Sequence, residues 1–203
     1  MRVTPRQFEQ IQERMGKARR APSGVLEPTC PPRTSSTHEI ILGIDPSLRG
    51  TGYGIIRWSN RRAELLAQGT IKSAAGWERS RCLLNIHQTL RGVLREQRAT
   101  VCIVEGLFYA QNLQTALIMG EARGASLVAA AEAGLAIYEI ATRKVKQAIV
   151  GYGAAQKSAV ARMVQRMLNL PEPPSPDAAD ALALALTYAQ ESSRYSLAPR
   201  RKI

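Results

Sequence analysis

The sequence predicts an α/β fold with a mixed five-stranded sheet flanked by helices. Residues 39–44 and 101–104 are almost wholly apolar runs, which are typical of strands buried on both faces of a sheet. Strand patterns first follow one another directly and later alternate with helical patterns. This order indicates three antiparallel strands followed by parallel ones, and hence a mixed sheet.

The first part of the domain is expected to supply the three antiparallel strands. Residues 39–44 form the first strand, which ends at Asp45. Residues 45–54 are dense in turn-forming residues, which predicts a reversal of the chain. Residues 55–58 are typical of a returning strand, and residues 63–71 are expected to form the third.

The rest of the domain alternates helices and strands. Apolar residues recur at helical spacing within residues 79–97, and the strand 101–105 follows directly, which predicts a strand–helix–strand crossover. An alanine-rich helical pattern covers residues 113–133, and residues 136–140 are expected to form the fifth strand. Three further helical patterns cover residues 142–150, 157–169 and 177–190.

The chain of 203 residues is long enough for one domain with a well-buried core, which we place at residues 39–190. Residues 1–38 carry seven basic and three acidic side chains, with four prolines between residues 22 and 32. We expect them to form a basic extension and Pro-rich linker that is partly disordered. Residues 191–203, with four basic side chains and one acidic, are expected to form a basic tail.

The charge of the chain favours a polyanionic partner. Lys and Arg outnumber Asp and Glu by 28 to 16, which gives a formal net charge of +12. Such an excess favours nucleic acid as a partner ahead of an acidic membrane surface.

The cysteine pattern and the hydropathy of the chain indicate in which cellular compartment the protein is found. Cys30, Cys82 and Cys102 have neither a CxxC spacing nor an even count, so neither a zinc ribbon nor a disulfide framework is indicated. No stretch approaches the roughly 20 continuous apolar residues of a transmembrane helix, and the N-terminus lacks the apolar core of a secretory signal. We therefore expect a cytoplasmic protein with no membrane partner.

Four acidic residues have the pattern of a metal site. Asp45 and Glu105 each end an apolar strand, and Asp177 and Asp180 share one helical face by their spacing of three. Clustered carboxylates suit hard divalent cations such as Mg²⁺, which relieve their mutual repulsion.

Each of the four acids also has an ordinary structural interpretation. On spacing alone, Asp177 and Asp180 fit N-terminal capping and compensation of the helix dipole better than metal binding. Taken singly, Asp45 fits a turn-forming acid before proline and Glu105 a solvated acid at a sheet edge, each as well as it fits a metal ligand.

Several separated motifs, which arrive in order between about residues 40 and 190, resemble the RuvC family of bacterial Holliday-junction endonucleases. They are Gly43-Ile44-Asp45-Pro46 with Thr51-Gly52-Tyr53-Gly54; Glu105 with Phe108 and Asn112; Gly120-Glu121-Ala122-Arg123-Gly124; Val145-Lys146-Gln147 with Gly151, Gly153 and Lys157-Ser158; and the run from Asp177 through Asp180 to Ala183. Ser47 departs from the family pattern, which often has glycine there, so the turn after Asp45 is expected to be built slightly differently.

The resemblance implies an RNase H-like fold, a homodimer and a Mg²⁺-dependent endonuclease that resolves a four-way junction by paired symmetric nicks in recombination and repair. The catalytic and metal-binding acids would be Asp45, Glu105, Asp177 and Asp180. We expect two Mg²⁺ ions in each active site, about 4 Å apart, with Mn²⁺ as a substitute. Our hypothesis is that Asp45 binds both ions, Glu105 and Asp180 complete one site, and Asp177 contributes to the other. The partners implied are the RuvA and RuvB branch-migration proteins.

The family motifs also imply residues that contact DNA. Lys146 and Lys157 align with positions near the scissile strand, where Lys146 would offset charge developing in the transition state. Phe108 would wedge into or stack on unpaired bases, and Asn112 would contact DNA beside it. Without the alignment, both lysines fit a solvated helix face and Phe108 fits core packing.

Three other functions remain open at this point. One is an RNase H-like nuclease that acts on RNA, and another is a noncatalytic junction-binding protein. The third takes the segment from Gly43 through Gly54 as an actin-like phosphate site, although 203 residues are few for a two-lobed ATPase.

Overall fold

The computed structural model describes residues 39–106, 112–192 and 201–203, all of which belong to one compact unit. The predicted extension 1–38, residues 193–200 of the predicted tail, and Phe108 lie outside the described residues. No helix in the described ranges is both long and apolar enough to cross a membrane.

The mixed five-stranded sheet predicted from the sequence is confirmed. The strands are β1 (Glu39–Asp45), β2 (Gly50–Ser59), β3 (Arg62–Lys72), β4 (Val101–Glu105) and β5 (Ala136–Ile140). The first three pair antiparallel, whereas β4 runs parallel to both β1 and β5. A two-residue strand, β6 (Arg201–Lys202), adds an antiparallel edge beside β5, so the strand order is β3-β2-β1-β4-β5-β6.

The reversal predicted over residues 45–54 is shorter than expected. β1 extends through Asp45 and β2 begins at Gly50, so only residues 46–49 connect them. Gly50, Gly52 and Gly54, which lie in the predicted turn, are therefore residues of β2. Their small size allows a helix to pack closely on this strand.

All five predicted helices are present, with ends within two residues of those expected. They are α2 (Arg79–Gln97), α3 (Leu113–Glu132), α4 (Thr142–Val150), α5 (Lys157–Met167) and α6 (Pro176–Ser192). Gly151 ends α4 with a φ of 99°, a left-handed conformation that glycine adopts without a steric penalty.

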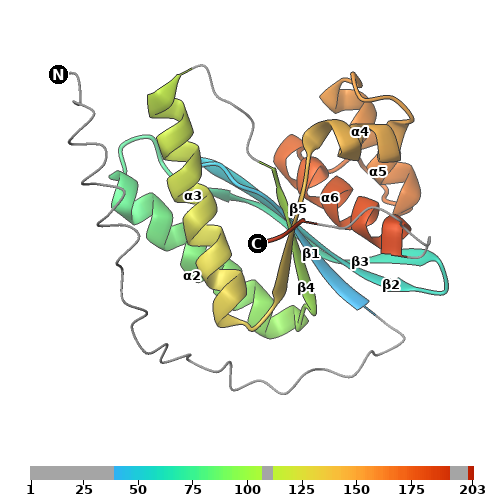
Figure 1. Ribbon diagram of the computed structural model, residues 1–203, viewed down its shortest axis with the longest axis horizontal. Coiled ribbons are helices and arrows are strands. Elements are labelled where there is room, and N and C mark those ends of the chain that lie inside the picture. The colour runs from blue at the N-terminus through green and yellow to red at the C-terminus, as the bar shows by residue number, and fades with distance from the viewer. Residues whose placement is uncertain (1–38, 107–111, 193–200) are drawn as a thin grey trace, which may run out of the picture. The chain divides into compact units, whose positions relative to one another are not determined.

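Helices cover both faces of the sheet, with α2 and α3 on one face and α4, α5 and α6 on the other (Figure 1). Alternate residues of β1 enter the two cores: Ile41 faces α6, whereas Leu42 and Ile44 face α2 and α3. Both sets are fully buried, which is why the first strand has an uninterrupted apolar sequence rather than an alternating one.

Candidate active site

The first two acids lie side by side at the carboxyl ends of adjacent strands. β1 and β4 are parallel, and Ile44 pairs with Val104, so Asp45 and Glu105 follow at neighbouring positions. Residues two positions earlier in each strand, Gly43 and Ile103, face α6. Because side chains alternate along a strand, both acids point to that same face of the sheet.

The turn after Asp45 is fixed by a buried hydroxyl. The Thr51 hydroxyl donates to the Ser47 carbonyl at 2.6 Å and accepts from the Ser47 amide at 3.2 Å. Both contacts use the main chain of Ser47, so a glycine at that position could make them as well.

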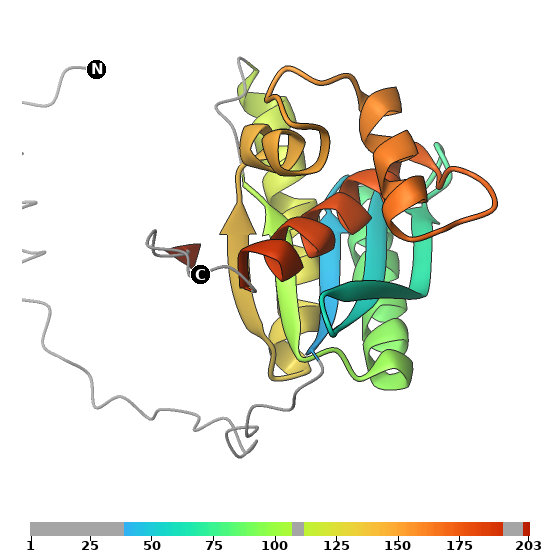
Figure 2. The ribbon, with the colours of Figure 1, turned by 90° about the vertical axis from the view of Figure 1, so that its right-hand side faces the viewer.

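Helix α6 lies directly on the sheet because three glycines leave room for it. A Cβ atom at Gly43 would be 1.9 Å from the Ala181 carbonyl oxygen, and one at Gly52 would be 2.0 Å from the Asp177 carbonyl oxygen. One at Gly54 would be 2.5 Å from the Leu182 side chain. These separations are too short for any side chain, so the main chain of α6 contacts β1 and β2; Figure 2 shows the helix crossing that face.

This close approach brings the second pair of acids to the first. Asp180 lines one small cavity together with Asp45 and Glu105. Asp177 does not line that cavity: its main chain packs against Gly52, the cross-strand partner of Asp45, and its carboxylate lies near Gly50, where β2 begins. Three of the four predicted acids therefore meet around one cavity at the ends of β1 and β4, and Asp177 lies one helical turn from Asp180 on α6.

The environment of Asp45 favours its protonated form. Burial, the charges of Glu105 and Asp180, and a hydrogen bond shared with Glu105 raise the pKa of Asp45 from 3.8 to about 8, although Lys157 opposes this shift. Burial is the largest of these causes, followed by the charge of Glu105.

Lys157 supplies a positive charge to the cluster. Its Nζ atom lies 2.9 Å from Oδ2 of Asp180, with 69% of the lysine side chain and 25% of the aspartate side chain exposed. The hydrogen bond to Asp180, together with the charges of the acids, raises the pKa of Lys157. Lys157 is the first residue of α5, and this position places it at the acids. Its predicted place near the scissile strand stays a prediction.

The other predicted DNA-binding residues have different surroundings. Lys146 of α4 is half-buried and lines the same cavity as the acids. The side-chain oxygen of Asn112 caps α3 by accepting from the amides of Gln114 and Thr115, at 2.9 and 3.4 Å. Asn112 is thus committed to the helix through its oxygen, while Phe108 lies outside the described residues.

Two residues without a predicted role contact Glu105. Arg123 of α3 donates to the Glu105 carbonyl, and the Thr142 hydroxyl at the start of α4 donates to the Glu105 carboxylate. Arg123 is also paired with Glu139 at 2.6 Å. The available signal was one arginine in the buried face of an otherwise small-residue helix.

The donor set fits a hard divalent cation in its chemistry. Four carboxylates provide the oxygen ligands that Mg²⁺ and Mn²⁺ take, and Asp45 stands among like charges that a cation would offset. Within the described ranges, no three acidic, histidine or cysteine side chains are already arranged to hold one ion. Binding therefore requires the carboxylates to turn from their hydrogen bonds toward the metal.

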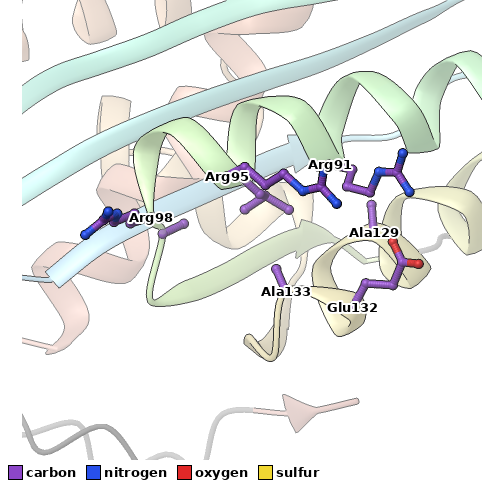
Figure 3. Close-up of a pocket in the computed structure, with 8 residues that line it drawn as sticks. Arg91, Arg95, Arg98, Ala129, Glu132 and Ala133 are labelled. Atoms are coloured by element: carbon purple, nitrogen blue, oxygen red, sulfur yellow. The ribbon is translucent and has the colours of Figure 1, made fainter. Parts of the chain in front are cut away.

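A larger cavity, of about 520 Å³, lies away from the acids (Figure 3). It is lined by Arg91, Arg95 and Arg98 with Ala129, Glu132 and Ala133 near the ends of α2 and α3. Arg98 precedes the start of β4, whereas Glu105 is its last residue, so this cavity lies toward the opposite end of the sheet. None of the predicted site residues within the described ranges lines it.

Comparisons with known proteins agree on one family. The model of crossover junction endodeoxyribonuclease RuvC matches residues 41–188. RuvC of Akkermansia muciniphila is 46% identical over 148 residues, which cover 73% of this chain and 89% of the relative. RuvC of Marinobacter nauticus is 47% identical over 150 residues, 74% of this chain and 85% of the relative.

A solved structure gives the same result. T. thermophilus RuvC in complex with a Holliday junction substrate matches with a TM-score of 0.72 and 34% identity. The match covers 81% of this chain and 99% of that one.

Proposed function

This chain belongs to the RuvC family of crossover junction endodeoxyribonucleases, and we propose that it resolves Holliday junctions by paired symmetric nicks at the acid cluster. The observation that carries the proposal is the meeting of Asp45, Glu105 and Asp180 around one cavity, with Asp177 one helical turn away on α6. Divalent metal ions held by such a cluster of carboxylates can promote phosphodiester hydrolysis.

We propose Mg²⁺ as the metal, with two ions in each active site and Mn²⁺ as a substitute. Asp45 is the candidate for the shared ligand because it stands between Glu105 on β4 and Asp177 on α6. Glu105 and Asp180 would complete one site and Asp177 the other. The chemistry that these ions supply when bound is Lewis acidity, which activates water and stabilises the leaving oxygen.

The lysines are proposed to bind the scissile phosphate. Lys146 lines the cavity, so its ammonium group can offset charge that develops on phosphate oxygens. Lys157 pairs with Asp180, and its ammonium group would become available to a DNA phosphate if Asp180 turned toward a cation. Phe108 remains a predicted contact to the unpaired bases of the junction, and Asn112 a predicted DNA-binding residue.

We propose that α3 forms the homodimer interface. Leu113, Leu117 and Val128 recur at helical spacing and are 74%, 58% and 54% exposed. Gly120 and Gly124 lie in the same stripe, and a Cβ atom at either would meet nothing within 4 Å. An exposed apolar stripe with small residues at its centre suits close packing against the same helix of a second copy.

The remaining partners are predictions from the family. RuvA and RuvB would deliver the junction to the nuclease, and work on chromosomal DNA predicts a cytoplasmic location. The basic extension 1–38 and the tail 191–203 would contribute positive charge outside the nuclease domain 39–190.

The proposed function is tested by strand-mapped cleavage of a synthetic mobile four-way junction with Mg²⁺. Linear duplex and an RNA/DNA hybrid serve as competing substrates. We expect paired nicks at the junction alone, abolished by Asp45→Asn but retained by Glu64→Gln, which removes a carboxylate from an exposed surface pair. Binding without cutting, or preference for the hybrid, would contradict the proposal.

A further inference from the structure

We propose that Arg123 and Thr142 are positioning residues of the nuclease: Arg123 fixes the main chain of Glu105, and Thr142 orients its carboxylate. The inference rests on the proposed function, since it assigns roles relative to Glu105. Both contacts come from elements outside β4, namely α3 and the first residue of α4. Glu105 is therefore held from two sides at the point where its strand ends.

Arg123 reaches Glu105 through a buried ion pair. Its side chain is 7% exposed and that of Glu139 is 16% exposed, with 2.6 Å between Nη2 of Arg123 and Oε2 of Glu139. Glu139 pairs with Val104 across the parallel strands, so it fixes the guanidinium beside the end of β4. The other terminal nitrogen, Nη1, donates to the Glu105 carbonyl.

This use of arginine is specific to its shape. Burying a charged pair seldom adds net stability compared with apolar residues of similar volume, so stability alone gives little reason for it. The planar guanidinium can donate in two directions at once, whereas a lysine ammonium on a flexible stem defines no such fork. Arg123 thereby ties the main chain of Glu105 to β5 and α3.

Thr142 acts on the other end of the same residue. It follows Ile140, the cross-strand partner of Glu105, by two positions, which places its hydroxyl beside the carboxylate. The Glu105 side chain also shares a hydrogen bond with Asp45. The carboxylate is thus held between Thr142 and Asp45, facing the cavity that the acids line.

Positioning of this kind has a measurable effect on rate. A displacement of about 1 Å in a catalytic group reduces the rate by up to about 100-fold, because the reacting atoms lose their alignment. Loss of either contact should therefore slow cleavage and weaken metal binding, while junction binding without metal is unchanged because the basic surface remains.

The first test replaces Thr142 by Val, which keeps its shape but removes the hydroxyl, and by Ser, which keeps the hydroxyl. We expect Thr142→Val to lower kcat about tenfold and to raise the Mn²⁺ concentration for half-saturation in calorimetry without DNA. Thr142→Ser should restore both to within about threefold of the unchanged protein. Equal metal binding and equal kcat in the Val variant would overturn the role of Thr142.

The second test separates positioning by Arg123 from its contribution to stability. Arg123→Lys keeps the charge opposite Glu139, and Arg123→Gln with Glu139→Gln neutralises both partners, so neither leaves a buried charge alone. We expect both variants to fold and to bind junction in EDTA normally, with kcat reduced about tenfold and metal binding weakened. Wild-type kcat and metal affinity in the Lys variant would refute the role of Arg123.

Failure of the positioning roles of Arg123 and Thr142 can be distinguished from failure of the proposed function. If the unchanged protein does not cut the junction, or Asp45→Asn still cuts it, the nuclease assignment itself fails. If the unchanged protein cuts and Asp45→Asn does not, changes in kcat and metal affinity at positions 123 and 142 test positioning alone.

Discussion

The ammonium group of Lys157 lies 2.9 Å from the Asp180 carboxylate, at the edge of the acid cluster. This ion pair engages the Asp180 carboxylate, which a divalent cation would need as a ligand. A divalent cation that binds Asp180 would therefore compete with Lys157, and the freed ammonium group could then contact DNA. Several measurable consequences follow from this and other contacts in the site.

Lys157→Gln should have opposite effects on metal binding and on cleavage. Removing the competing ammonium should lower the Mn²⁺ concentration for half-saturation by about threefold in calorimetry without DNA. The same change should slow junction cleavage about tenfold, because a phosphate contact is lost. Lys144→Gln, at the exposed pair with Glu191, is the matched control and should change neither quantity. Weaker metal binding in Lys157→Gln would count against competition.

Asp45→Asn should stabilise the metal-free protein at neutral and higher pH. The pKa of Asp45 is raised from 3.8 to about 8, so between these values the folded protein retains a proton that the unfolded chain releases. Stability therefore falls as pH rises through this window, and the asparagine variant lacks that fall. We expect its Tm in EDTA to exceed that of the unchanged protein by about 3 °C or more at pH 8, and the difference to vanish near pH 4. Equal Tm values at pH 8 would contradict the assigned pKa.

Metal uptake should release a proton from Asp45. A carboxylic acid must ionise before it can coordinate metal, so below about pH 8 binding displaces the proton. Apparent Mn²⁺ affinity should rise with pH by up to about tenfold per unit between pH 6 and 8, and level off above. Calorimetry in buffers of different ionisation enthalpy measures the proton count directly. An affinity independent of pH over this range would rule the linkage out.

Gly43→Ala should disrupt both stability and cleavage. The new methyl group would lie 1.9 Å from the Ala181 carbonyl oxygen, so α6 must move away from β1 and carry Asp180 with it. We expect a loss of about 3 kcal/mol or more in the free energy of unfolding, and no detectable nicking. Gly92→Ala in α2 is the control, because a Cβ there meets nothing and should stabilise by up to about 1 kcal/mol. Normal cleavage by Gly43→Ala would show that the contact does not set the site.

Leu117→Glu should separate the proposed homodimer. The side chain is 58% exposed within the apolar stripe of α3, so a charge there is tolerated in a monomer but not at a close interface. Sedimentation should show monomer for this variant and dimer for the unchanged chain. Leu84→Glu, at a position 53% exposed on α2, is the control and should remain dimeric. A dimeric Leu117→Glu variant would place the interface elsewhere.

Most of the fold could be predicted from the sequence because the pattern that indicates each helix or strand lies within the residues of that element. The apolar runs ending in Asp45 and Glu105, and the helical spacing around α2, depend only on neighbouring residues. The glycines of β2 predict a turn because glycine is common in turns. Their actual contact, with α6, involves residues more than a hundred positions away, so no local pattern indicates it.

The acid cluster was predicted, but the residues that support it were not. Glu105 and Asp180 could be predicted because Glu105 ends a strand and Asp180 lies near the start of a helix. The hydroxyl of Thr142 and the guanidinium of Arg123 act across tertiary contacts, and neither residue type nor spacing indicates their partner. Asn112 is predicted to contact DNA, but its position also has a local structural reason. Asparagine is a favoured helix N-cap, and its side chain caps α3.

The direct contact between α6 and the strands also makes the geometry of the acids less sensitive to how the core is filled. A helix normally rests on a sheet through side chains, so its height varies when those side chains are exchanged. Here the closest contacts, at Gly43 and Gly52, are with the main chain of α6, so the separation there does not depend on the size of a packed side chain. Exchanges among the apolar side chains beside α6 should therefore change the distance between Asp180 and Asp45 less than a substitution at Gly43 does.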